Sequence, residues 1–199
     1  MKFSESQKDQ YRKQAKIQGY RSRSAFKLLQ INNSFKIIRP GFKVIDVGCA
    51  PGGWLQVAFE ETNSRGKIIG IDLKPVDPLE GIKIIEGDIQ DENIIHSIIE
   101  YLQSKADVIL SDLSPNISGL WDLDHSKQIH LTRICLSVSR KVLKTNGNAI
   151  FKVFYGDQLE SLKLEMKKSF RNVTLHKPKA SRDSSSEIYI VAKNFCANH

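Results

Sequence analysis

The chain has 199 residues, of which 40% are hydrophobic and 26% are charged, and its formal net charge is +8. The length and the apolar fraction predict one globular domain with a real core, and the positive charge favours an anionic partner, nucleic acid first. Three cysteines without CxxC or Cys/His ligand spacing argue against a disulfide framework, a zinc site or another metal centre.

No apolar run approaches the roughly 20 residues that cross a membrane, and the N-terminus lacks the apolar region of a secretory signal. Glu5 and Asp9 also weaken a mitochondrial presequence. We therefore expect a cytoplasmic monomer without a membrane partner. The mitochondrion and the nucleolus remain alternative locations.

Residues 1–21 are polar and basic without a clear apolar stripe, which predicts an N-terminal arm with some helix, followed by one domain over 22–199. Ser22 or Ser24 can cap a helix that runs to about Asn33. Lys27 lies on this helix, which has an apolar face to pack against the body.

Strands and helices then alternate. The composition of each segment predicts strands at 43–47, 67–72, 83–86, 107–111, 148–154, 172–176 and 187–192, and helices at 53–61, 92–103, about 126–143 and 158–169. Asn146-Gly147 is expected to end the helix before 148, and the polar segment 177–186 to be a mobile loop.

This alternation predicts the α/β class, a Rossmann-like domain whose seven-stranded sheet is mostly parallel, with helices on both faces. The last two predicted strands have no helix between them, so we expect an antiparallel hairpin at the end of the sheet. Ligands of such sheets bind at the carboxyl ends of the strands.

A glycine-rich segment, Asp46-Val-Gly-Cys-Ala-Pro-Gly-Gly-Trp54, follows the first predicted strand. Gly48 permits a tight turn, and Gly52 and Gly53 permit close backbone approach where the helix starts. The segment is neither GxGxxG nor a Walker A loop, which disfavours a pyrophosphate site.

Acidic residues end the next two strands. Asp72 can accept the hydroxyls of an adenosine ribose, and Asp88 can accept an adenine amino group. With Asp46 they form a predicted acidic cleft, which suits a sulfonium and repels a dinucleotide phosphate. S-adenosylmethionine (SAM) therefore fits better than NAD.

The chain resembles the FtsJ/RrmJ family of SAM-dependent ribosomal RNA 2'-O-methyltransferases. The resemblance covers about Gly19 to Lys193, and Cys49 stands where the bacterial enzymes usually have alanine. The matching segments, in chain order, are DVGCAPGGW, GDIQDE, SDLSPNISG, FKVF and SSEIYIVA.

The resemblance implies a SAM methyltransferase fold and a cofactor site. Its expected cofactor-binding residues are Asp46, Gly48, Cys49, Pro51, Gly52, Gly53, Trp54, Asp72, Leu73, Asp88, Ile89 and Asp112.

The resemblance also implies a catalytic Lys-Asp-Lys-Glu tetrad formed by Lys27, Asp112, Lys152 and Glu187. A ribose 2'-hydroxyl is a weak acid, so the enzyme must align it and remove its proton. A lysine does this only when neutral, a form that burial and a nearby cation favour. We assign Lys152 as proton acceptor, Asp112 as its orienting partner, Lys27 as ribose holder or tuning charge, and Glu187 as the support of one lysine.

Phosphate contacts are expected from the arm and from the loop before the last strand, at Arg21, Arg23, Lys177, Lys179 and Arg182. Four aromatic residues are candidates to stack on a flipped base, although packing within the protein is the commoner role of any one of them. They are Tyr20, Trp121, Phe154 and Tyr155.

The leading hypothesis is methylation of a ribose, expected to be a uridine's, in large-subunit ribosomal RNA or the large ribosomal subunit. The segment Ser-Pro-Asn-Ile-Ser-Gly after Asp112 resembles the ribosomal branch of the family, whereas Gly-Ala-Pro-Asp is commoner in the tRNA branch. A tRNA 2'-O-methyltransferase is the close alternative. A non-catalytic RNA-binding assembly factor is a third hypothesis, and a nicotinamide dehydrogenase is disfavoured because GxGxxG is missing.

Overall fold

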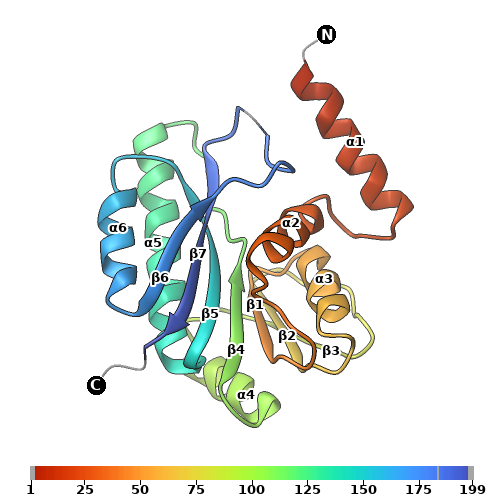
Figure 1. The fold of residues 1–199 in the computed structure, drawn as a ribbon, viewed down its shortest axis with the longest axis vertical. Coiled ribbons are helices and arrows are strands. Elements are labelled where there is room, and N and C mark those ends of the chain that lie inside the picture. Colours follow the sequence, from red (N-terminus) through yellow and green to blue (C-terminus); the bar gives the residue numbers. More distant parts are fainter. Residues whose placement is uncertain (1–2, 183, 197–199) are drawn as a thin grey trace.

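A computed structural model describes residues 3–182 and 184–196, with the backbone alone described for residues 3–9. Within these residues six helices flank one seven-stranded sheet (Figure 1). The helices are α1 (Phe3–Ile17), α2 (Ala25–Phe35), α3 (Gly53–Glu61), α4 (Glu92–Leu102), α5 (Trp121–Val142) and α6 (Leu159–Lys167). The strands are β1 (Val44–Val47), β2 (Ile68–Asp72), β3 (Ile82–Glu86), β4 (Ala106–Ser111), β5 (Leu143–Phe154), β6 (Phe170–His176) and β7 (Glu187–Phe195).

The strand order is β3-β2-β1-β4-β5-β7-β6, and the first five strands in this order are parallel. β7 lies between β5 and β6 and is antiparallel to both. The predicted α/β sheet with a terminal antiparallel pair is therefore confirmed. Because β7 is inserted beside β5, its first residues lie next to the last residues of β5, at the carboxyl edge of the parallel strands.

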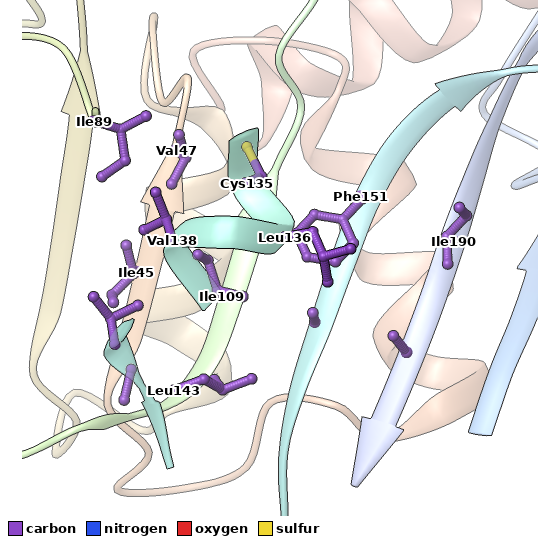
Figure 2. Close-up of a cluster of buried hydrophobic side chains, with 14 of the residues drawn as sticks. Ile45, Val47, Ile89, Ile109, Cys135, Leu136, Val138, Leu143, Phe151 and Ile190 are labelled. Carbon is purple, nitrogen blue, oxygen red and sulfur yellow. The ribbon is translucent and has the colours of Figure 1, made fainter. Parts of the chain in front are cut away.

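Helices cover both faces of the sheet, as predicted. On one face, α4, α5 and α6 bury a core that includes Leu136 and Val138 of α5 against Ile109 and Phe151 of the sheet (Figure 2). On the other face, α2 and α3 pack against alternate strand residues such as Ile150. Successive strand residues point to opposite faces, so the apolar runs of these strands serve both cores.

The boundary between α5 and β5 differs from the prediction. α5 begins at Trp121 rather than near 126, because the Asp124 carboxylate accepts hydrogen bonds from Ser118 and Gly119 and folds the preceding loop onto the first helical turn. Acidic residues in that turn also favour the helix N-terminus. At the other end the helix stops at Val142 and β5 begins at once, so the prediction that Asn146-Gly147 ends the helix was wrong.

The N-terminal arm forms α1, which packs beside α2 through a small cluster of Ala15, Phe26 and Ala180. Ala180 belongs to the loop between β6 and β7, and its amide donates to Gln30 Oε1 of α2 at 3.0 Å. This loop, expected to be mobile, is thus anchored to the two N-terminal helices. Among the described residues, no helix is long and apolar enough to cross a bilayer. The division into an arm and a domain at residue 21 stays a prediction.

Candidate active site

A cavity of about 780 Å³ lies at the carboxyl edge of the parallel strands. Gly48 follows β1, Asp72 ends β2, and Asp112 follows β4, so all three reach this edge because their strands are parallel. The volume is within the usual range for small-molecule sites, about 300–1,000 Å³. The wall opposite the strand ends is formed by Leu113–Asn116 and by the α5 residues Ser126, Lys127, His130 and Leu131.

Hydrogen bonds fix Asp72 at this edge of the sheet, and close packing fixes Gly48. The Asp72 carboxylate accepts the backbone amides of Ala50 at 2.8 Å and Lys74 at 2.9 Å, and each oxygen keeps capacity for a further donor. Gly48 has a φ of +78°, and a Cβ there would lie 2.5 Å from Leu113 Cδ2. Glycine is therefore required both for the turn and for the approach of the β4 loop.

The glycine pair of the predicted cofactor loop has a different use from the one expected. A Cβ on Gly53 would lie 2.2 Å from Ser22 Oγ, and one on Gly52 would lie 3.0 Å from Arg21 Nη1. Both glycines are buried, and they admit the segment before α2 rather than lining the cavity.

Arg21, predicted to bind RNA, is engaged inside the chain. Its guanidinium donates to the carbonyl oxygens of Pro51, Asp77 and Pro78 at 3.3, 2.6 and 2.9 Å. These bonds join the glycine-rich loop to the loop after β2. Arg21 therefore supports the cofactor loop, and its predicted contact with RNA stays a prediction.

Trp54 is buried, packs against Tyr189 and donates its indole N–H to the Ser24 carbonyl at 2.9 Å. It fixes α3 against α2 instead of facing the cavity. Cys49 is also buried, and burial, with Asp46 and Asp72 nearby, raises the pKa of its thiol. Trp54 and Cys49, both predicted to bind the cofactor, therefore support the cofactor loop from the interior of the protein.

Asp46 does not line the cavity either. It is fully buried, and neither of its carboxyl oxygens has a hydrogen-bond partner among the described residues. Burial, reinforced by Asp112 and Asp72, raises the pKa of Asp46 well above its ordinary value. Asp46 is therefore buried away from the cavity wall, and its predicted contribution of negative charge to the cleft stays a prediction.

The remaining predicted cofactor residues lie around the cavity or beside it. Leu73 lines it and is 71% exposed. Asp88 and Pro51 are exposed and Ile89 is buried, and none of the three is on its wall. Their contacts with a cofactor stay predictions.

The four residues of the predicted tetrad converge from α2, the β4 loop, β5 and β7. Lys27 forms an ion pair with Glu187. Lys152 donates to the Asp112 carbonyl at 2.7 Å and lies 3.4 Å from Asp112 Oδ1. Both lysines are largely buried, 7% exposed each, so two oppositely charged pairs are held together in a poorly solvated place.

Tyr189 joins the two pairs. Its hydroxyl lies 2.9 Å from Asp112 Oδ1 and 2.6 Å from Glu187 Oε1. Burial, with the charges of Asp112 and Glu187, raises the pKa of Tyr189 well above its ordinary value, so the phenol keeps its proton. The ring also lies 5.7 Å from Lys27 Nζ, which adds a cation–π contact.

The backbone of Lys152 is held by α5. Gln128 Nε2 and Thr132 Oγ1 donate to the Lys152 carbonyl at 2.9 and 3.2 Å. Both side chains are buried, and α5 crosses the end of β5 at this point. The position of the lysine along the strand is therefore fixed from the opposite face of the sheet.

Arg23, in the segment before α2, interacts electrostatically with Arg182 of the loop before β7, with Glu187 of the tetrad and with Arg12 of α1. Burial and the Arg182 guanidinium lower the pKa of Arg23, Glu187 opposes this shift, and Arg12 adds to it. Three arginines in one neighbourhood favour an anionic partner. Lys177 and Lys179 of the same loop are exposed, and Lys177 Nζ donates to the Ser185 carbonyl at 2.9 Å.

Sequence reasoning missed Tyr189, Gln128 and Thr132. Tyr189 had a signal, because it is two residues from Glu187 in a strand and therefore shares its face. The α5 residues had none, since nothing local to a helix shows which carbonyl group it will meet.

The sequence model of the FtsJ-like methyltransferase family matches residues 20–195. A ribosomal RNA large subunit methyltransferase E from Nitrosopumilus maritimus is 47% identical, with 98% of this chain and 99% of the relative covered. The protein of that name from Methanocaldococcus jannaschii is 46% identical, with 94% and 79% covered.

Solved structures agree with this. A candidate ribosomal RNA methyltransferase from Plasmodium falciparum has a TM-score of 0.81 at 35% identity, covering 88% of this chain and 98% of that one. Fibrillarin from Aeropyrum pernix, solved with bound SAM, has a TM-score of 0.60 at 17% identity, covering 87% and 75%, which shows a shared fold alone. The family model spans most of the chain, and the chain belongs to the FtsJ-like methyltransferase family.

Proposed function

We propose that this protein transfers a methyl group from SAM to a ribose 2'-hydroxyl of large-subunit ribosomal RNA. One observation carries the proposal: Asp112 belongs both to the wall of the 780 Å³ cavity and to the buried charge cluster. A molecule in the cavity therefore lies beside Lys27 and Lys152, the two lysines of the cluster that can accept or hold a proton.

The residues present fit SAM. Asp72 has acceptor capacity at a strand end, where the hydroxyls of an adenosine ribose would bind. The glycine at position 48 keeps the β1 turn close to the cavity, and Leu73 and Pro115 add apolar lining. Asp72 and Asp112 are the two acids on the cavity wall, and they suit the cationic sulfonium. When bound, SAM supplies a methyl group already activated by its positive sulfur.

The chain itself then has to orient the ribose and receive its proton. Lys152 Nζ is held by Asp112 through two contacts, so its position relative to the cavity is fixed. We assign the proton to this amine. Lys27 is paired with Glu187, so a second positive charge lies in the same cluster as Lys152. The Tyr189 hydroxyl lies between the carboxylates of Asp112 and Glu187 and fixes their positions relative to each other.

An RNA substrate is supported by the net charge of +8 and by the cluster of Arg12, Arg23 and Arg182 at the mouth of the site. Large-subunit ribosomal RNA is supported by the names of relatives at 46% and 47% identity. A monomeric state and a cytoplasmic location stay predictions.

Methyl transfer from radiolabelled SAM tests the proposal. Large ribosomal subunits, deproteinised ribosomal RNA and tRNA are offered in parallel, and the labelled nucleoside is identified after digestion. We expect label in ribosomal RNA as a 2'-O-methyl nucleoside. Label in tRNA alone would establish the alternative substrate, and label on a base would contradict the ribose chemistry.

Lys152→Ala separates catalysis from binding. We expect loss of methyl transfer with SAM affinity retained, because Lys152 is not on the cavity wall. Lys163→Ala is the matched control, since Lys163 lies on α6 and pairs with Glu160 on the surface. Near-normal turnover of Lys152→Ala would refute the proton-acceptor assignment.

A further inference from the structure

Trp121, His125 and Phe154 form a stacked aromatic group at the start of α5, which we name the aromatic shelf. The indole lies 5.7 Å from the His125 ring at 18° and 6.1 Å from the Phe154 ring at 28°. His125 and Phe154 are buried, whereas Trp121 is 47% exposed. The indole is thus held by two neighbours while much of its surface meets solvent.

Nearby apolar residues are also exposed. Ile117 is 63% and Leu120 is 67% exposed. Large apolar side chains gathered on a surface usually mark a binding site. The cavity and the tetrad use none of these residues.

The shelf lies beside the tetrad. Phe154 pairs directly with Glu187 across β5 and β7, and Lys152 pairs with Tyr189. Residues two apart in a strand share a face and lie about 7 Å apart, so Phe154 is the neighbour of Lys152 on the tetrad face. Trp121 stacks on Phe154, and Phe154 is two residues along β5 from Lys152.

We propose that Trp121 stacks on an unpaired base of the RNA substrate, at a nucleotide next to the methylated one. The inference rests on the proposed function, because the ribose delivered to Lys152 brings its neighbours within reach of the shelf. A base can stack on the indole only when its own face is free of a neighbouring base, so the nucleotide must be unstacked. The shelf thus selects single-stranded RNA.

The local charges favour a base over a phosphate. Asp122 is exposed beside Trp121, and Asp157, whose side chain is 87% exposed, contacts His125. These carboxylates repel phosphate groups, while a neutral base can still stack on the ring. Phosphate contacts fall instead to Arg12, Arg23 and Arg182, of which Arg12 lies on α1, far from α5 in the view of Figure 1.

The first test measures binding of a dye-labelled single-stranded RNA heptamer by anisotropy. Trp121→Ala is expected to raise the dissociation constant about 5- to 150-fold, the range for loss of one base–aromatic stack. Trp121→Phe keeps a ring and is expected to lose much less. Leu123→Ala, which removes exposed apolar surface from the same helical turn without removing a ring, is expected to bind like the unsubstituted protein.

Intrinsic fluorescence gives a second readout, because the chain has two tryptophans and Trp54 is buried. The heptamer should quench the emission, and Trp121→Phe should abolish the quenching while Trp54 still emits. A blunt duplex of the same sequence should quench little. Urea unfolding midpoints of the variants verify that each is folded.

Equal heptamer affinity of Trp121→Ala and the unsubstituted protein would overturn the proposal. An equal loss of heptamer affinity in Leu123→Ala would also overturn it. So would a Trp121→Ala binding defect that is seen with ribosomal particles but not with naked RNA, because the shelf would then contact a protein. Methyl transfer by the unsubstituted protein tests the proposed function separately. Heptamer binding tests the role of the aromatic shelf, whatever the result of the methyl-transfer assay.

Discussion

Replacing Tyr189 by phenylalanine removes one oxygen atom from the centre of the charge cluster. The ring remains, so its packing on Trp54 and its contact with Lys27 are kept. What is lost is the hydroxyl that bridges Asp112 and Glu187. The phenol has one proton and can donate to one carboxylate at a time, so the loss counts as a single hydrogen bond to a charged group.

Such a bond contributes about 1.5–3 kcal/mol to stability. For a domain of this size, each kcal/mol shifts the melting temperature by about 2–4 °C, which predicts a decrease of about 3–12 °C. Methyl transfer should also fall, because Asp112 loses the contact that holds it against Lys152 and the cavity. SAM affinity should change less than turnover, since Tyr189 does not line the cavity.

The effect depends on pH. Burial by itself would raise the pKa of Glu187, but Lys27 and Lys152, with hydrogen bonds from Lys27 and Tyr189, lower it below the ordinary 4.5. A lowered pKa gives stability that is present above the unfolded-state value and is lost as the pH falls through the folded-state value. The difference between Tyr189→Phe and the unsubstituted protein should therefore be full at pH 7 and shrink below about pH 4.5.

Urea unfolding at a series of pH values measures this difference. Tyr155→Phe is the matched control, because Tyr155 is 67% exposed and its hydroxyl should add little. A Tyr189→Phe difference below about 0.5 kcal/mol at pH 7, or one that does not change with pH, would show that the hydroxyl does not serve ionised carboxylates.

Three further variants test the supports of the site. Gly53→Ala should destabilise by about 1–3 kcal/mol although alanine favours helices, because its Cβ would lie 2.2 Å from Ser22 Oγ; unfolding of the Gly53→Ala/Ser22→Ala double variant should recover part of the loss. Asp124→Asn should weaken SAM binding, because it loosens the loop at Ser118. It should also lower the stability of the protein at neutral pH, since the unsubstituted protein keeps this contribution until the pH falls through the lowered pKa of Asp124. Acid unfolding curves of the two proteins that coincide would contradict this. Arg182→Gln should reduce the slope of log affinity for single-stranded RNA against log salt by about 0.7, and an unchanged slope would remove Arg182 from the phosphate contacts.

The pattern of the sequence was sufficient for most of the fold. Apolar segments separated by amphipathic ones predicted every strand except β5 within three residues at each end, because local composition limits where a buried strand can lie; β5 begins five residues before its predicted start. The errors fall at α5, whose start is set by Asp124 binding a loop and whose end is set by the pairing of β5 with β4. Both depend on contacts that the segment itself does not display.

For the candidate site, the sequence was enough to select the four residues that meet, since each stands in a distinctive context at a strand end or on the helix before the sheet. It paired Asp112 with Lys152 and left open which lysine Glu187 supports. The structure pairs Lys27 with Glu187 and Lys152 with Asp112, because β7 enters between β5 and β6 and carries Glu187 toward α2.

Residue type and order along the chain therefore determined the α/β class, the glycine-rich turn and the candidate tetrad. Burial and contact were decided only by the tertiary structure. It raised the pKa of Asp46, packed Gly53 against the segment before α2, turned the Arg21 guanidinium toward the loops after β1 and β2, and brought Tyr189 between two carboxylates. The physical reason is that charge state and contact depend on which surfaces meet across the sheet, and strands distant in sequence meet only when the sheet order is set.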